Sequence, residues 1–143
     1  MTVFVAQVPL RWADQDAYRH LNHARAVTVL EEARIALFFA HASADGFAGF
    51  AGGLLVAGLS VEYKRQVDYR SHPLRVGMTV DRVRAASFVI DYVVHDGSDE
   101  NAPVAITAQS RMATFDLDAQ RPRRMSESEQ KWLSTWARED STP

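Results

Sequence analysis

The chain has 143 residues, of which 47% are hydrophobic and 24% charged, and its formal net charge is −2. This length and composition predict one globular domain spanning residues 1–143, and the near-neutral charge argues against a nucleic-acid partner. Because the chain has no cysteine, disulfides, thiolate nucleophiles and thiolate metal sites are excluded.

The chain begins with a predicted short strand, over residues 3–10, which alternate loosely. This segment lacks the features of a signal peptide, and no stretch approaches the roughly 20 apolar residues that span a bilayer. We therefore expect a cytoplasmic protein without membrane contact. Asn22 is a favoured N-cap, and the absence of Gly and Pro from Ala24 to Ala42 predicts a long helix. Apolar residues cover most of its circumference, which indicates a helix enclosed by the rest of the protein.

After the helix the pattern changes to that of a β protein. Residues 45–53 contain four glycines and predict a mobile loop. Alternating apolar and polar residues then predict a strand from Ser60 to Tyr69. Further strands are expected at residues 75–84, 88–95 and 104–116. Ser126 with Glu129 forms a capping-box pattern for a last helix through Trp132 and Trp136. An antiparallel sheet curled around one helix is the arrangement that this order predicts.

The segment just ahead of the long helix, residues 11–23, is dense in titratable groups. Free N–H groups at a helix N-terminus stabilise negative charge, and a carboxylate beside them can act as nucleophile or general base. These are the two parts that acyl transfer requires. Asp14 and Asp16 are the candidate carboxylates, although aspartates also order turns. Asp14, Asp16, His20 and His23 resemble a zinc donor set, but the two histidines straddle the helix start, so we expect no metal site.

The motifs of this segment are similar to those of the 4-hydroxybenzoyl-CoA thioesterase family of hotdog proteins. The matching residues, in chain order, are Arg11-Trp12-Ala13-Asp14-Gln15-Asp16, His20-Leu21-Asn22, Glu32-Ala33-Arg34, Tyr63-Lys64-Arg65, Ser87-Phe88 and Arg121-Pro122. The resemblance implies an α+β hotdog fold, in which a curved antiparallel sheet wraps around a long central helix, with the C-terminal helix added. It also implies an acyl-CoA thioesterase, which hydrolyses its substrate to a free acid and coenzyme A.

The resemblance further assigns roles to residues. Asp16 is the expected catalytic carboxylate, and the backbone N–H near His23 is expected to bind the thioester carbonyl. His20 and Asn22 shape the turn and the helix cap and are candidate substrate contacts. Arg19 stands where the family usually has Gly, so it bears on substrate choice. His23 and Ala26 replace an Asn and a Tyr of the family pattern.

The family also predicts the partners of the chain. Coenzyme A enters only as part of the substrate, and no other cofactor is expected. The family builds its site at a dimer interface and often pairs dimers, so we expect a homodimer or homotetramer. The strand predicted from Ser60 to Tyr69 should lie close to the partner's site. The glycine-rich loop, Gly46 to Gly53, is expected to cover the acyl pocket.

Several alternatives stay open from the sequence. Asp16 either attacks the thioester or activates water. Glu32 is a second candidate carboxylate, or else a buried acid paired with Arg34 or another basic group. A hotdog protein that binds acyl-CoA without turnover, as a sensor or carrier partner, is the alternative function. A hydratase of the same fold is disfavoured, because it needs an Asp-x-Asn-Pro-x-His arrangement that is absent after Asp16.

Overall fold

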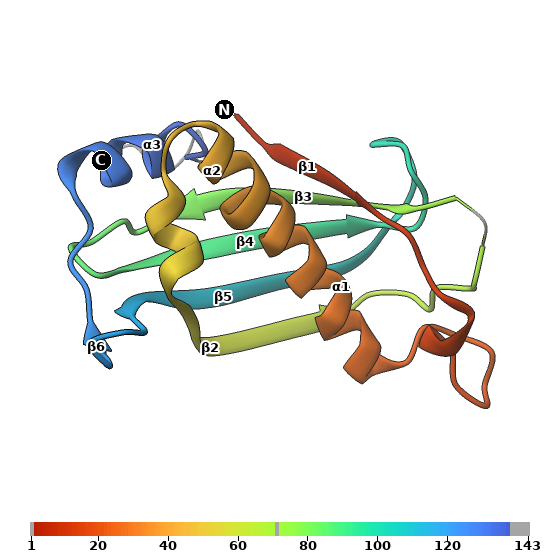
Figure 1. Cartoon of the computed structure of the whole chain (residues 1–143). Coiled ribbons are helices and arrows are strands. Elements are labelled where there is room, and N and C mark those ends of the chain that lie inside the picture. Colours follow the sequence, from red (N-terminus) through yellow and green to blue (C-terminus); the bar gives the residue numbers. More distant parts are fainter. Residues whose placement is uncertain (1, 71, 138–143) are drawn as a thin grey trace.

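An antiparallel sheet curves around one long helix, and a second helix packs at one end of the sheet (Figure 1). The computed structural model describes residues 2–70 and 72–137. The strands lie in the order β1-β3-β4-β5-β2, and β6 pairs with β5. Their bounds are β1 Phe4–Val8, β2 Leu54–Tyr63, β3 Leu74–Asp81, β4 Ser87–His95, β5 Val104–Asp116 and β6 Arg121–Pro122. The expected α+β hotdog fold is confirmed.

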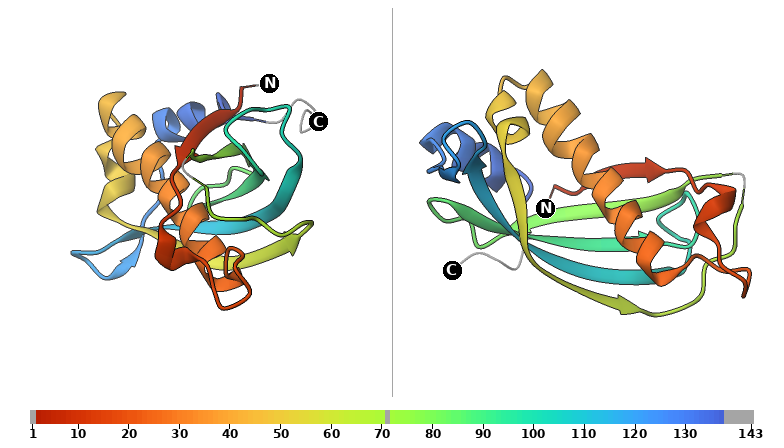
Figure 2. Two further views of the ribbon diagram at one scale, coloured as in Figure 1. Left: turned by 90° about the vertical axis from the view of Figure 1, so that its right-hand side faces the viewer. Right: turned by 60° about the horizontal axis from the view of Figure 1, so that its bottom comes forward.

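The central helical rod consists of α1 (His23–Ile35), the π-helical segment η2 (Ala36–His41) and α2 (Ala42–Ala44). It lies across the concave side of the sheet (Figure 2), where five of its residues have no exposed surface: Leu30, Ala33, Leu37, Phe38 and Ala42. The expected helix and its Asn22 cap are confirmed, whereas the π-helical turn was not predicted. No helix within residues 2–70 and 72–137 is both long enough and apolar enough to cross a bilayer.

The strand β2 lies earlier in the chain than expected. The sequence predicted Ser60 to Tyr69, but the β2 ladder begins at Leu54 and ends at Tyr63, which pairs with Ile106. The N–H groups of Lys64 and Arg65 both donate to the carbonyl of Ala105, at 2.7 and 3.2 Å, as the chain turns away. The period-2 residue pattern continues past Tyr63 into a loop, where Val67 is buried but Arg65 and Tyr69, on the same expected face, are exposed.

The glycine-rich segment does not cover the Asp16 loop of its own chain. It contains the short 3-10 helix η3 (Ala48–Gly52), and Phe50 is fully buried against Phe38, Phe88 and Trp132. The segment follows the C-terminal end of the helical rod, while Asp16 precedes its N-terminal end, about 30 Å away for 22 residues at 1.5 Å each. The expected lid is therefore wrong for a single chain.

The last helix, α3 (Glu127–Ser134), begins as predicted. Ser126 accepts from the Glu129 N–H at 3.1 Å, and the Glu129 carboxylate accepts from the Ser126 N–H at 2.9 Å. The Trp132 indole donates to Asp45 at 2.9 Å, which fixes α3 to the end of the helical rod. The helix stops at Ser134, so Trp136 lies in the turn beyond it.

Gly53 allows the start of β2 to pack closely on β5. A Cβ atom added at Gly53 would lie 1.9 Å from the backbone oxygen of Phe115, whereas one added at Gly52 would meet nothing within 4 Å. We expect Gly53→Ala to lower the free energy of unfolding by about 1–3 kcal/mol through overpacking. Gly52→Ala is the matched control and should change it little. Urea unfolding of both variants checks this, and equal stabilities would contradict it.

Candidate active site

Asp14 anchors the loop that joins β1 to α1. Its carboxylate accepts from the Arg11 N–H at 2.8 Å and from the Arg11 guanidinium at 3.0 Å, and its backbone oxygen accepts from the Asn22 N–H at 2.9 Å. Asp14 is buried. Burial alone raises the pKa of its carboxyl, but the hydrogen bonds and charge of Arg11 outweigh burial and hold this pKa below its ordinary value. Asp14 therefore holds the loop together.

Asp16, two residues on, points its carboxylate towards the start of α1. One oxygen accepts from the Tyr18 N–H at 2.9 Å and the other from the Asn22 side-chain amide at 3.3 Å. The Tyr18 N–H lowers the pKa of the Asp16 carboxyl most; burial opposes this, and Asn22 and His20 lower the pKa further. Asp16 is therefore ionised at neutral pH and stays partly open to solvent.

Asn22 links this carboxylate to the helix N-terminus. Its side-chain oxygen caps α1 by accepting from the Ala24 N–H at 2.9 Å, while its side-chain nitrogen donates to Asp16. The His23 N–H has no hydrogen-bond acceptor within the described part of the chain. The Tyr63 hydroxyl donates to the His23 carbonyl at 2.8 Å, which ties the first helical turn to the end of β2. A free N–H donor thus stands at the helix start, next to the residue that holds Asp16.

A pocket of about 450 Å³ brings these groups together. Asp16, His20 and His23 line one side, and the segment from Tyr63 to Val67 lines the other. His20 lies 3.4 Å from Asp68 through its Nε2, while its buried Nδ1 has no hydrogen-bond partner among the described residues. Tyr63, Lys64 and Arg65 were recognised in the sequence only as motif matches. Their place opposite Asp16 follows from the turn after β2, which residue spacing does not reveal.

Arg19 lies outside this pocket and lines a shallow depression with Trp12 and Asp16. Its φ angle of 65° is in the left-handed region that favours glycine. This backbone conformation accounts for the glycine that the family usually has there. The left-handed turn is retained here with a side chain that is exposed beside Asp16.

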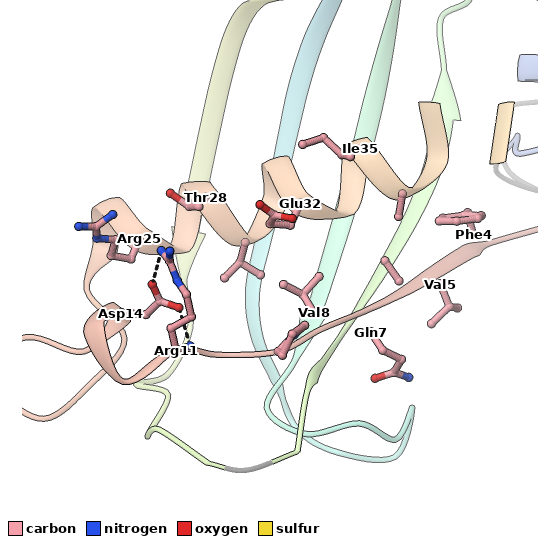
Figure 3. Close-up of a pocket in the computed structure, with 14 residues that line it drawn as sticks. Phe4, Val5, Gln7, Val8, Arg11, Asp14, Arg25, Thr28, Glu32 and Ile35 are labelled. Carbon is pink, nitrogen blue, oxygen red and sulfur yellow. Dashed lines mark hydrogen bonds and ion pairs between the residues drawn. The ribbon is translucent and has the colours of Figure 1, made fainter. Parts of the chain in front are cut away.

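Glu32 is not brought near Asp16. It lies on another side of α1, where it lines a groove of about 640 Å³ between α1 and β1 together with Arg11 and Arg25 (Figure 3). Glu32 is exposed, so the alternative of a buried acid paired with Arg34 is wrong. The Arg34 guanidinium donates to Tyr92 instead, at 3.2 Å.

The zinc alternative finds no geometric support in the part of the chain that the structure describes. No group of three or more His, Asp or Glu side chains converges there on a position for a metal ion. Asp14 is already paired with Arg11, and His20 lies against Asp68.

A family model matches most of the chain, over residues 10–133, and describes the thioesterase-like superfamily. The chain belongs to this superfamily. Its expected enzyme class, a thioester hydrolase, follows from this membership. The narrower 4-hydroxybenzoyl-CoA thioesterase family stays a prediction. No curated protein matches the sequence significantly.

Several solved structures described as thioesterases share the fold of this chain at low sequence identity. A predicted thioesterase from Bacillus stearothermophilus is 18% identical, with a TM-score of 0.79 over 96% of this chain and 98% of the other. A putative thioesterase from Pseudomonas aeruginosa is 23% identical, with a TM-score of 0.75 over 90% and 96%. A Thermus thermophilus thioesterase, complexed with coenzyme A and Zn, is 19% identical, with a TM-score of 0.73 over 92% of each chain.

The environment of Asp14 makes stability depend on pH. We expect Asp14→Asn to lower the free energy of unfolding by about 1–3 kcal/mol at pH 7, because it removes charge-assisted hydrogen bonds. The folded-state pKa lies below the unfolded value of about 3.9. The difference in the free energy of unfolding between wild type and Asp14→Asn should therefore be fully present above about pH 5. It should vanish as the pH falls through the folded-state pKa of Asp14. Urea unfolding over a pH series measures it.

Asp118→Asn, in an exposed turn, is the matched control for this series and should not alter stability. Equal stability of Asp14→Asn and wild type at pH 7 would show that Asp14 does not anchor the loop.

Proposed function

We propose that the chain hydrolyses an acyl-CoA thioester to a free acid and coenzyme A, with Asp16 as its catalytic carboxylate. The observation that carries this proposal is the arrangement around Asn22. One amide caps the helix and also holds the ionised Asp16, and the neighbouring His23 N–H is left without an acceptor among the described residues. The Asp16 carboxylate, which can act as a base, and the His23 N–H, which can donate a hydrogen bond to a carbonyl, therefore lie at one pocket.

The chemistry follows from these two groups. The His23 N–H, reinforced by the helix dipole, donates to the thioester carbonyl oxygen and stabilises the negative charge that develops there. Asp16 either takes a proton from the attacking water or attacks the carbonyl to form an anhydride that water then hydrolyses. In both routes the C–S bond breaks, and coenzyme A leaves as a thiolate that takes up a proton. Neither route requires a metal or a further cofactor.

Recognition of coenzyme A is supported by the opposite side of the pocket. Lys64 and Arg65 are exposed there and carry positive charge, which suits the phosphates of the nucleotide portion. Arg65 also lies 3.4 Å from Asp96, so Lys64 is the less committed cation. A Thermus thermophilus relative was solved with coenzyme A. His20 lines this pocket and Asn22 holds Asp16, so both are candidate contacts of the substrate, while Arg19 lies in the neighbouring depression with Asp16.

Assembly through β2 completes the proposal. β2 is an edge strand of the sheet, and several of its apolar side chains and of those on the adjacent helical face are exposed: Leu55, Val56, Leu59, Ile35 and Phe39. An unpaired apolar edge is a liability that association removes. We propose that two chains pair antiparallel through β2 as a homodimer, or as the unit of a homotetramer. The end of β2 near one Asp16 then lies against the partner chain.

The sharpest prediction concerns Asp16. We expect Asp16→Asn to lower kcat by at least about 10²-fold, since general-base catalysis alone supplies roughly 10²–10⁴-fold, while acyl-CoA affinity stays within several-fold. The measurement is a thiol-release assay over a panel of acyl-CoAs, with and without a chelator. Asp14→Asn shares the same loop and should reduce kcat less but stability more.

The same assay distinguishes the alternatives. Wild-type protein that binds acyl-CoA without releasing thiol would be a binding protein, not an enzyme. Normal turnover by Asp16→Asn, with Glu32→Gln inactive, would show that the catalytic carboxylate is in the groove of Figure 3. Loss of turnover on chelation would establish a metalloenzyme.

The assembly proposal gives a second prediction. Leu59 is 40% exposed on β2, and Leu117 is 50% exposed beyond β5. We expect Leu59→Glu to produce monomers with at least about tenfold lower activity, because a charge would be buried at the pairing edge. Leu117→Glu should assemble and react as wild type does. Analytical ultracentrifugation tests both, and a fully active wild-type monomer would contradict the proposal.

A further inference from the structure

Arg34, in the last turn of α1, is a buried charge with little to neutralise it. It is 9% exposed, and the one hydrogen bond that its guanidinium forms among the described residues goes to the Tyr92 hydroxyl, which lies 2.6 Å from the Ser110 hydroxyl. Across residues 2–70 and 72–137, no carboxylate lies within ion-pairing distance of the guanidinium. Arginine keeps its charge in proteins, and a charge held largely away from water favours an anionic partner. The other guanidinium nitrogens are not fully enclosed, so they are open to a ligand, and they have no carboxylate partner among the described residues.

Arg34 lines a pocket of about 200 Å³. Apart from Arg34 and Glu31, its walls are apolar and come from the helical rod, β2 and β5: Ile35, Phe38, Phe39, Leu54, Val56 and Met112. The wide turn of η2 begins just beyond Arg34, and it places Phe38 in the core while Phe39 stays exposed. An apolar cavity of about 150 Å³ can hold a benzene molecule. The pocket is thus large enough for one aromatic ring or a short aliphatic chain.

The two charged residues of the pocket differ in their surroundings. Glu31 is exposed, so water solvates and screens its carboxylate, and it forms no ion pair with Arg34. Arg34 is nine-tenths buried, so its charge acts on a ligand through a medium of low polarity. The planar guanidinium matches a carboxylate, with which it forms two parallel hydrogen bonds. The Arg34 side of the pocket therefore favours an anionic group.

We propose that this pocket binds the carboxylate end of a small apolar acid, with Arg34 as its anion-binding residue. Two sources supply such an acid: the far end of the acyl group of the thioester substrate, or a separate free acid. The first source rests on the proposed function. Arg34 is 11 residues after His23, or about 17 Å along its own helix, which is long for an acyl group. The β2 pairing proposed above would cover Ile35, Phe39 and Val56 of this pocket with the partner chain, and it would bring the pocket near the partner's Tyr63.

Binding is tested first without any reaction. Benzoate and its neutral match, benzyl alcohol, are titrated into the full-length protein while the methyl signals of 13C-labelled methionine are followed by NMR. Met112 lines the pocket, while Met78 and Met125 lie elsewhere in the core and serve as internal controls. We expect benzoate to shift the Met112 signal saturably and to bind at least about tenfold more tightly than benzyl alcohol.

Variants of the two charged residues identify the binding group. Arg34→Gln should weaken benzoate binding at least about tenfold, while Glu31→Gln should keep or strengthen it. If Arg34→Gln does not fold, Arg34→Lys takes its place, because it keeps the charge but loses the planar fork. No Met112 shift with benzoate, equal binding of the two ligands, or unchanged benzoate affinity in the Arg34 variant would each overturn the proposal.

Hydrolysis then separates the two sources. Glutaryl-CoA and pentanoyl-CoA have acyl chains of equal length, and only the first ends in a carboxylate. A selective loss of kcat/KM for glutaryl-CoA in Arg34→Gln makes the acyl group the source. If Arg34→Gln changes kcat/KM equally for both thioesters, and the wild type binds benzoate, the ligand of the pocket is a separate acid. If the wild type binds benzoate but hydrolyses no thioester, the pocket stands and the proposed function fails.

Discussion

The burial of one face of the central helix under the sheet determines where every group of the candidate site lies. Leu30, Ala33, Leu37 and Phe38 have no exposed surface, and burial of a large apolar side chain stabilises a protein by about 1.5–3 kcal/mol. This packing fixes the helix along its length and around its axis. The helix N-terminus is thereby held beside Asp16, and Arg34 is held against the sheet about midway along the helical rod. Both candidate ligand groups are consequences of a single packing arrangement.

Much of the fold was predictable because its signals are local. The Asn22 cap, the capping box at Ser126 and the strands β4 and β5 each depend on residues adjacent in the chain. The predictions were wrong where contacts between residues far apart in the chain determine the local structure. Val67 alternates like a strand residue although it is buried from a loop, and the π-helical turn at Ala36 has the composition of an ordinary helix. The burial of Phe50, likewise, could not be foreseen from glycines that suggest mobility.

The candidate site was likewise predictable only in part. The sequence indicated which residues stand near the helix start, but it did not show how they share their hydrogen bonds. The two roles of the Asn22 amide and the tie from Tyr63 to His23 join residues 6 and 40 positions apart. Arg34 was visible only as part of a motif, and its lack of an ionic partner among the described residues is a property of the packed structure. Pairings of this kind are set by the fold, not by spacing.

The position of β2 in the chain has a consequence for how the protein is made. Among the described residues of one chain, β2 forms its ladder with β5, and the paired residues run from Tyr63 with Ile106 to Leu54 with Thr114. Its partner therefore leaves the ribosome about 40–60 residues later, which at about 5–20 residues per second leaves β2 unpaired for about 2–12 s. During that interval an apolar strand is free to aggregate. Glu62, Lys64 and Arg65 lie at its end, where charged residues act as gatekeepers and keep the nascent segment in solution.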